Sequence, residues 1–103
     1  YEYNMLLIER YRAEAAKPLP AGEHSIEVIT TLVRPGAPAT VVINVDGEEV
    51  ARTNVKRTVP AAFTASETFD VGVDLGSPVS RDYAKRRPFE FNGVIKQVTV
   101  ALE

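Results

Sequence analysis

The stretch Thr40-Val-Val-Ile-Asn-Val-Asp-Gly-Glu-Glu-Val50 decides the fold class of this chain. Residues 40–45 are rich in β-branched side chains, which favour strands, and residues 50–55 form a second run of this kind. Asp46-Gly47 between the two runs is a strong hairpin signal, because a type I′ turn requires positive φ at both central residues. The sequence therefore predicts two antiparallel strands joined at Asp46-Gly47.

Strand-like runs separated by turn residues continue on both sides of this hairpin. Residues 25–33 alternate in polarity at the period of a half-buried strand. Asn92-Gly93 repeats the hairpin signal between residues 89–91 and 97–102. Two shorter strands are expected at residues 62–65 and 68–73, and none of the seven prolines interrupts a clean alternation. We expect an all-β antiparallel β-sandwich of the jelly-roll or concanavalin-lectin-like kind, with about eight strands.

The first sixteen residues fit two structures. Residues 9–16 have good helix propensity, and Arg10 and Glu14 lie one helical turn apart. An alternation of period 2 instead places these residues on one face of a strand: Tyr3, Met5, Leu7, Tyr11 and Ala13. We expect the strand, because it would cover an edge of an otherwise β-rich domain.

Composition excludes several classes of function. The 103 residues have the length of a single domain, and the net charge of −2 predicts no nucleic-acid partner. There is no cysteine, so disulfides and sulfur-based zinc sites are excluded. His24 is the only histidine, which excludes a multi-histidine metal site. The longest apolar run, Met5–Ile8, is far shorter than the ~20 residues of a membrane span.

Two charged clusters are the candidate binding sites. Asp70, Asp74 and Asp82 lie on a glycine-containing segment and supply oxygen atoms of the kind that bind calcium, although Asx turns explain the same residues. We expect no metal site there. Lys85-Arg86-Arg87 could contact phosphate or sulfate, but a solvated loop is the simpler interpretation. No catalytic residue is predicted.

Four stretches taken together resemble the C-terminal region of large prokaryotic arylsulfatases. The segment at residues 66–83 is the most specific of them. In chain order the stretches are LPAGEHSI at 19–26, VDGEEV at 45–50 running on to RTVP at 57–60, SETFDVGVDLGSPVSRDY at 66–83, and FEFNGVIKQVTVAL at 89–102.

This resemblance implies a non-catalytic accessory domain that packs on and stabilises the catalytic domain of a sulfate ester hydrolase. The chain opens at Tyr1, and its only methionine is Met5, so we expect a piece of a longer polypeptide. The parent protein would carry formylglycine and a divalent metal such as calcium in its catalytic domain, and this fragment would hold no cofactor.

The chain also departs from the family pattern. Residues 34–38 stand where the family often has a glycine-rich loop. Ser77-Pro78-Val79-Ser80-Arg81 has letters similar to the nucleophile motif Cys/Ser-x-Pro-x-Arg, but its proline comes one position early. The resemblance therefore assigns no catalytic role to any residue of this chain.

Two other functions are compatible with the sequence. One is an autonomous carbohydrate-binding module that recruits sulfated glycan through loops near residues 70–83 and 85–87. The other is a plain oligomerisation domain. The sequence leaves open whether the protein is periplasmic, secreted or cytoplasmic.

Overall fold

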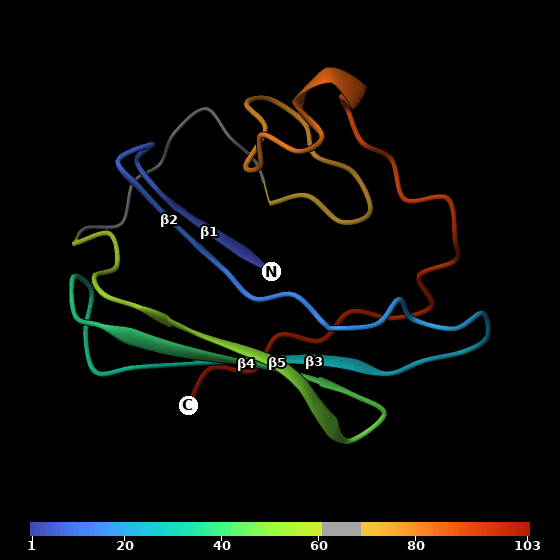
Figure 1. Ribbon diagram of the computed structural model, residues 1–103, viewed down its shortest axis with the longest axis horizontal. Coiled ribbons are helices and arrows are strands. Elements are labelled where there is room, and N and C mark those ends of the chain that lie inside the picture. The colour runs from blue at the N-terminus through green and yellow to red at the C-terminus, as the bar shows by residue number, and fades with distance from the viewer. Residues whose placement is uncertain (61–68) are drawn as a thin grey trace. The chain divides into compact units, whose positions relative to one another are not determined.

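The computed structural model describes residues 1–60 and 69–103 (Figure 1). These residues are all-β, with five strands in two antiparallel sheets, and they contain no α-helix. Their only helical segment is the short 3₁₀ turn η1 (Ala84–Arg86). The chain divides into two compact units, residues 1–63 and 64–103, and each is described by itself below.

The first unit contains a three-stranded antiparallel sheet in the order β3-β4-β5. Its strands are β3 (Ile26–Leu32), β4 (Ala39–Val45) and β5 (Glu48–Val55), which confirms the strands predicted in this region. Asp46 and Gly47 have φ values of 51° and 86°, so both central residues of the predicted turn adopt the conformation that a type I′ turn requires.

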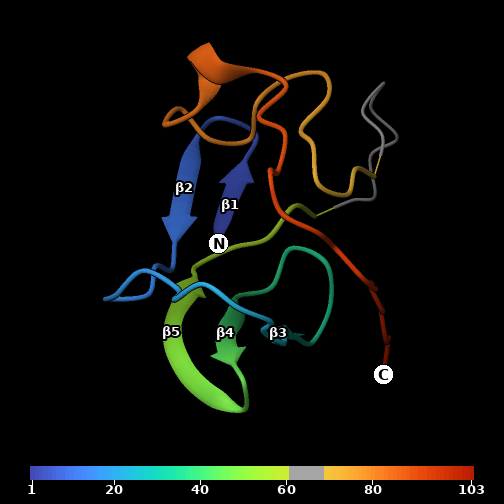
Figure 2. The same ribbon diagram turned by 90° about the vertical axis from the view of Figure 1, so that its right-hand side faces the viewer.

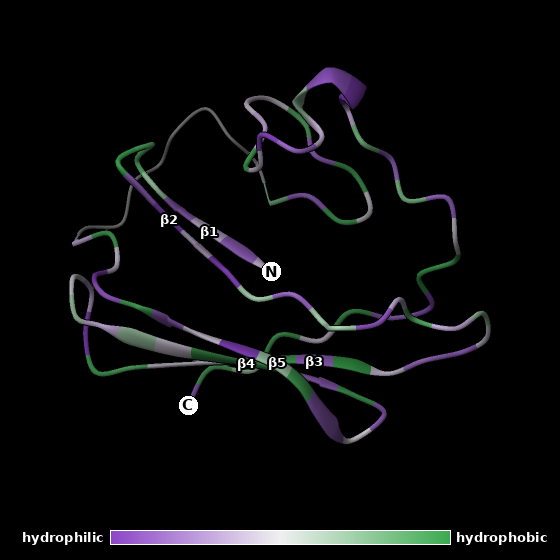
Figure 3. Cartoon of the chain, viewed as in Figure 1, coloured by the Kyte–Doolittle hydropathy of each residue, from purple (hydrophilic) through white to green (hydrophobic). Residues whose placement is uncertain are grey.

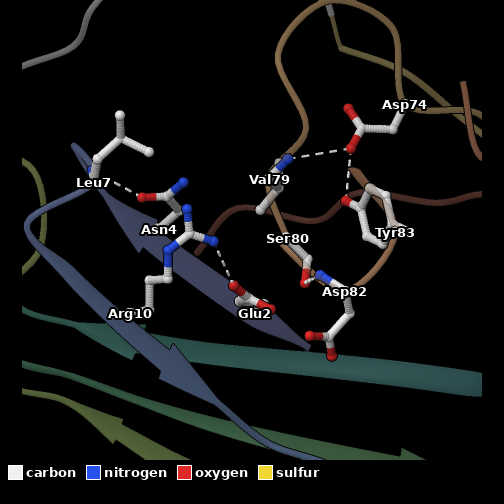
Figure 4. Close-up of polar contacts among 9 residues, drawn as sticks. All are labelled: Glu2, Asn4, Leu7, Arg10, Asp74, Val79, Ser80, Asp82 and Tyr83. Atoms are coloured by element: carbon white, nitrogen blue, oxygen red, sulfur yellow. Dashed lines mark hydrogen bonds and ion pairs between the residues drawn. The ribbon is translucent and has the colours of Figure 1, made fainter. Parts of the chain in front are cut away.

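The N-terminal residues form a β-hairpin and no helix. Strands β1 (Glu2–Met5) and β2 (Glu9–Arg12) pair with Tyr3 opposite Tyr11. The chain reverses at Leu6 and Leu7, whose φ values are 51° and 65°. The side chain of Asn4 stabilises this turn by accepting a hydrogen bond of 2.9 Å from the Leu7 amide (Figure 4). The preference for strand over helix is confirmed. The single strand is wrong, because Leu7 lies in the turn, and the hairpin forms its own sheet and covers no edge of the larger one.

The core of the first unit lies between this hairpin and one face of the sheet. Ala39, Val41 and Val55 are buried on that face, and Tyr3 and Tyr11 pack against them. Figures 1 and 2 show β1 and β2 on a single side of the sheet. The Tyr3 hydroxyl also accepts a 2.9 Å hydrogen bond from a backbone amide after β5, which fixes the ring over the core.

The opposite face of the sheet is largely polar. Its cross-strand pairs are held by side-chain hydrogen bonds from Asn44 to Glu27 and from Thr40 to Asn54, and Arg52 pairs with Glu49 within β5. Ile29 is an exception, because it is an apolar residue exposed on this face. The sheet is therefore amphipathic, with one face built for burial and one for solvent.

The second unit corrects part of the predicted fold. Residues 69–103 contain no strand, although strands were expected at 68–73, 89–91 and 97–102. One backbone hydrogen bond of 2.7 Å joins the first two of these segments, from Phe91 to Gly72, and a second of the same length runs beside them from Asp74 to Pro88. A regular ladder does not extend from them because proline has no N–H and Phe89 has a φ of 49°.

The second predicted hairpin turn is also wrong. Neither Asn92 nor Gly93 has the positive φ that a type I′ turn requires, in contrast to Asp46-Gly47. The side chain of Phe91 occupies the space beside Gly93, where a Cβ atom would lie 2.5 Å from the ring. The strand expected at residues 62–65 lies outside the described residues.

Candidate functional site

An exposed apolar stripe on β3 is the first candidate for a functional surface. Ile26, Val28 and Leu32 are 60%, 48% and 42% exposed, and we call these three residues the β3 stripe. By register they lie on the same face of the sheet as the buried residues Ala39 and Val41. Figure 3 shows the apolar colouring of β3 and β4. The hairpin of β1 and β2 thus covers only part of the sheet face that is built for burial.

The three aspartates proposed as calcium candidates lie on loops of the second unit. The Asp70 carboxylate accepts a 2.9 Å hydrogen bond from the Leu75 amide. The Asp74 carboxylate accepts bonds from the Val79 amide and the Tyr83 hydroxyl (Figure 4). The backbone amide of Asp82 donates to the Ser80 hydroxyl. Asp70 and Asp74 therefore organise the turns that follow them.

No metal-binding cluster is found in the described part of the chain. Within residues 1–60 and 69–103, no group of three or more histidine, cysteine, aspartate or glutamate side chains is placed to hold a metal ion. The same ranges contain no helix with the length and apolar character needed to cross a lipid bilayer.

The basic run of residues 85–87 also contacts its own loop. The guanidinium of Arg86 lies 5.0 Å from the centre of the Phe89 ring, and Arg87 donates a 3.3 Å hydrogen bond to the Gly76 carbonyl. Lys85 lies in η1 beside them. Phe89 stacks on Tyr83 with ring centres 4.3 Å apart. Arg86 thus contacts Phe89 and Arg87 contacts Gly76, and both contacts stabilise the loop that contains the basic run.

A depression of about 650 Å³ lies beside this aromatic pair. It combines aromatic rings with two carboxylates, a guanidinium and an amide, a set of groups that can bind a polar ligand with many hydroxyls. The lining residues are Val73, Asp74, Tyr83, Arg86, Phe89, Glu90, Phe91 and Asn92. The structure brings together Asp74 and Arg86, one member of each cluster singled out from the sequence.

Sequence reasoning missed the part that Phe89 plays in this depression. The aromatic residues were expected in the core of a sandwich, yet Phe89 is 41% exposed and stacks on Tyr83 across the basic run. The sequence feature that could have predicted this stack is the position of Tyr83 and Phe89 on either side of the basic run.

His24 joins two loops of the first unit. Its Nδ1 lies 2.7 Å from the Asp46 carboxylate, and its Nε2 lies 2.7 Å from the Pro20 carbonyl. The hydrogen bond to Asp46 and that to Pro20 raise the pKa of His24, while the hydrogen bond from His24 and that from the Ser25 amide lower the pKa of Asp46. Both ring nitrogens face acceptors, so His24 is placed to hold the two loops together.

A second charged cluster connects β2 with the segment after β5. The Tyr11 hydroxyl donates a hydrogen bond to Glu9, and Arg57 forms a 3.0 Å ion pair with the same carboxylate. The hydrogen bond to Glu9 raises the pKa of Tyr11, and the bonds from Tyr11 and Arg57 lower the pKa of Glu9. This cluster supports the position of the β1–β2 hairpin.

No protein-family model, curated protein or solved structure matches this chain. The resemblance to the C-terminal region of arylsulfatases therefore stays a prediction from the sequence motifs.

Proposed function

We propose that this chain is a non-catalytic accessory domain of an arylsulfatase-like hydrolase and packs on its catalytic domain. The motifs of residues 19–26, 45–60, 66–83 and 89–102 motivate the choice of family. The observation that carries the packing role is the β3 stripe. It extends the buried face of the sheet into solvent, where an apolar surface is costly to leave uncovered.

Burial of the β3 stripe would make a substantial contribution to such an interface. Full burial of one aliphatic side chain contributes about 1.5–3 kcal/mol. The three side chains also lie on one face of one strand, so a flat partner surface can cover them together. The proposal includes a jelly-roll or lectin-like sandwich as the kind of fold, with the five strands of the described residues in place of the expected eight.

A charge placed in the β3 stripe tests the packing role. Val28→Asp in the complete polypeptide should weaken the association of this domain with the rest of the protein and lower the thermal stability of the whole. Asn54→Asp adds the same charge to an exposed position of β5 on the polar face, so it is the matched control. Equal effects of the two variants would contradict a packing role for the β3 stripe.

The depression beside Tyr83 favours a second candidate, a carbohydrate-binding module. In this function the aromatic pair and the polar groups around it would bind a glycan, and Arg86 would contact a sulfate group. The isolated chain would then bind sulfated glycans on an array, and Arg86→Ala would remove that binding. If no glycan binds the folded chain, this second function is excluded.

A further inference from the structure

Within residues 1–60 and 69–103, no strand pairs with the outer edge of β3. In the sheet order β3-β4-β5, β3 pairs with β4 on one side only, and all of its residues from Ile26 to Leu32 are exposed. An edge strand presents a row of backbone groups that can pair with another strand. This edge is distinct from the apolar face that the proposed function uses.

The hydrogen-bond pattern identifies the outward-facing backbone groups. The Asp46 amide donates a 2.8 Å bond to the Ser25 carbonyl, which makes Ser25–Asp46 a hydrogen-bonded pair. Hydrogen-bonded and non-hydrogen-bonded pairs alternate along an antiparallel ladder. The N–H and C=O groups that point away from β4 therefore belong to every second residue of β3, namely Ile26, Val28, Thr30 and Leu32.

Strand β3 has few of the features that normally prevent pairing between edges. It contains no lysine or proline, its only charged residue is Glu27, and its pairing with β4 runs without a bulge. Edge strands that avoid association usually combine several such features, whereas β3 has a single charged side chain. The edge is therefore suited to accept another strand.

We propose that the β3 edge binds the β3 edge of a second copy of this chain, so that two three-stranded sheets join into one antiparallel sheet. The two-fold axis would pass through Ile29. In this register Ile26 lies opposite Leu32 of the other copy, and Val28 lies opposite Thr30. Glu27 lies opposite Thr31, so no like charges face each other.

The exposed position of Ile29 supports a second copy as the occupant. Ile29 is 43% exposed on a sheet face whose other side chains are mostly polar. At the two-fold axis it would lie opposite its own copy in a non-hydrogen-bonded pair, where facing side chains approach most closely. The symmetric pairing thus buries the one apolar side chain that β3 exposes on the polar face of the monomer.

Charge substitutions at Thr31 test the register of this pairing. The mass of the chain would be measured by sedimentation equilibrium over a range of concentrations, and we expect a dimer of twice 11.3 kDa. Because each Thr31 faces a Glu27, Thr31→Lys should tighten the dimer about fivefold and Thr31→Glu should weaken it by a similar factor. A dimer that does not respond to the sign of this charge would overturn the proposal.

Two further variants test the axis and the edge. Ile29→Lys should abolish the dimer by placing two charges together, while Asn54→Lys on β5 should leave it intact. Val28→Pro removes an outward N–H that β4 does not use, so it should also abolish the dimer. Circular dichroism would establish that each variant retains its β-structure. A single-chain mass for the folded wild-type protein at all concentrations would overturn the proposal and leave the proposed packing role untouched.

Discussion

His24 and Asp46 form an ion pair in which Nδ1 lies 2.7 Å from Oδ2, and it joins the segment before β3 to the turn between β4 and β5. The Asp46 carboxylate also accepts a 2.9 Å bond from the Ser25 amide at the start of β3. The Asp46 side chain thus links the β4–β5 turn to the residues just before β3. The stability of the first unit therefore depends on the protonation of His24 and Asp46.

The first prediction is a maximum of stability at mildly acidic pH. The folded-state pKa of His24 is raised above 6.5, so its stabilisation is complete below that pH and is lost as the pH rises through the raised value. The pKa of Asp46 is lowered below 3.8, so its stabilisation is present above that pH and is lost on acidification. Thermal unfolding should therefore give a higher Tm at about pH 5.5 than at about pH 8.

Asp46→Asn is the matched variant for this prediction. Asparagine also tolerates positive φ and is favoured before glycine in a type I′ turn, so the hairpin is kept while the charge is removed. The difference in Tm between wild type and variant should shrink as the pH rises from about 5.5 to about 8. A difference that is constant with pH would show that the ion pair does not contribute.

The second prediction concerns the turn at Gly47. Its φ is 86°, and a Cβ atom there would meet no atom within 4 Å, so the cost of a side chain comes from the backbone alone. Gly47→Val should destabilise the protein by about 1–2 kcal/mol or more, because β-branched residues disfavour this conformation. Gly47→Asn should cost less. Equal midpoints for the two variants in urea would contradict this explanation.

The third prediction tests the core beneath the hairpin. Val41 has no exposed surface, and Tyr3 and Tyr11 pack against the cluster to which it belongs. Val41→Ala should lower the free energy of unfolding by about 2 kcal/mol through lost burial and a residual cavity. The same substitution at Val33, which is 93% exposed, should change it little. Similar losses of unfolding free energy at Val41 and Val33 would contradict the burial of Val41 between the sheet and the β1–β2 hairpin.

The fourth prediction is that calcium does not stabilise the protein. The Asp70 and Asp74 carboxylates already accept hydrogen bonds from their own turns. A ligand that binds only the native state raises Tm with the logarithm of its concentration. We therefore expect the same Tm with and without millimolar calcium. A rise of several degrees that Asp70→Asn removes would contradict this prediction.

The sheet of the first unit was predictable because the polarity pattern of its strands and the turn residues between them indicate the same structure. Residues 25–55 combine period-2 alternation with Asp46-Gly47, a dipeptide that favours only one kind of turn. The reversal at Leu6 and Leu7 was not predictable from those residues, because leucine rarely adopts positive φ. Its signal is Asn4, whose side chain accepts the Leu7 amide bond.

The second unit was harder to predict because alternation alone does not supply a strand partner. Val98, Val100 and Leu102 alternate with polar residues or alanine as a strand would, yet the structure gives this segment no ladder. Asn92-Gly93 has the letters of a hairpin turn without its φ values. Of the candidate site, the charged clusters were visible in the sequence, whereas the stacking of Phe89 on Tyr83 depends on the turn between them.

The most direct test of the proposed function is a comparison of sulfate ester hydrolysis by the isolated chain and by the native protein. Antibodies against residues 1–103 would capture the native polypeptide from the cells that make it, and both samples would be incubated with a chromogenic aryl sulfate. Hydrolysis requires an activated nucleophile, and the chain has no cysteine and one histidine, which is engaged with Asp46. We expect turnover by a captured polypeptide much larger than 11.3 kDa and none by the isolated chain. A captured polypeptide without sulfatase activity, or turnover by the isolated chain that is lost on mutation of its residues, would contradict the proposal.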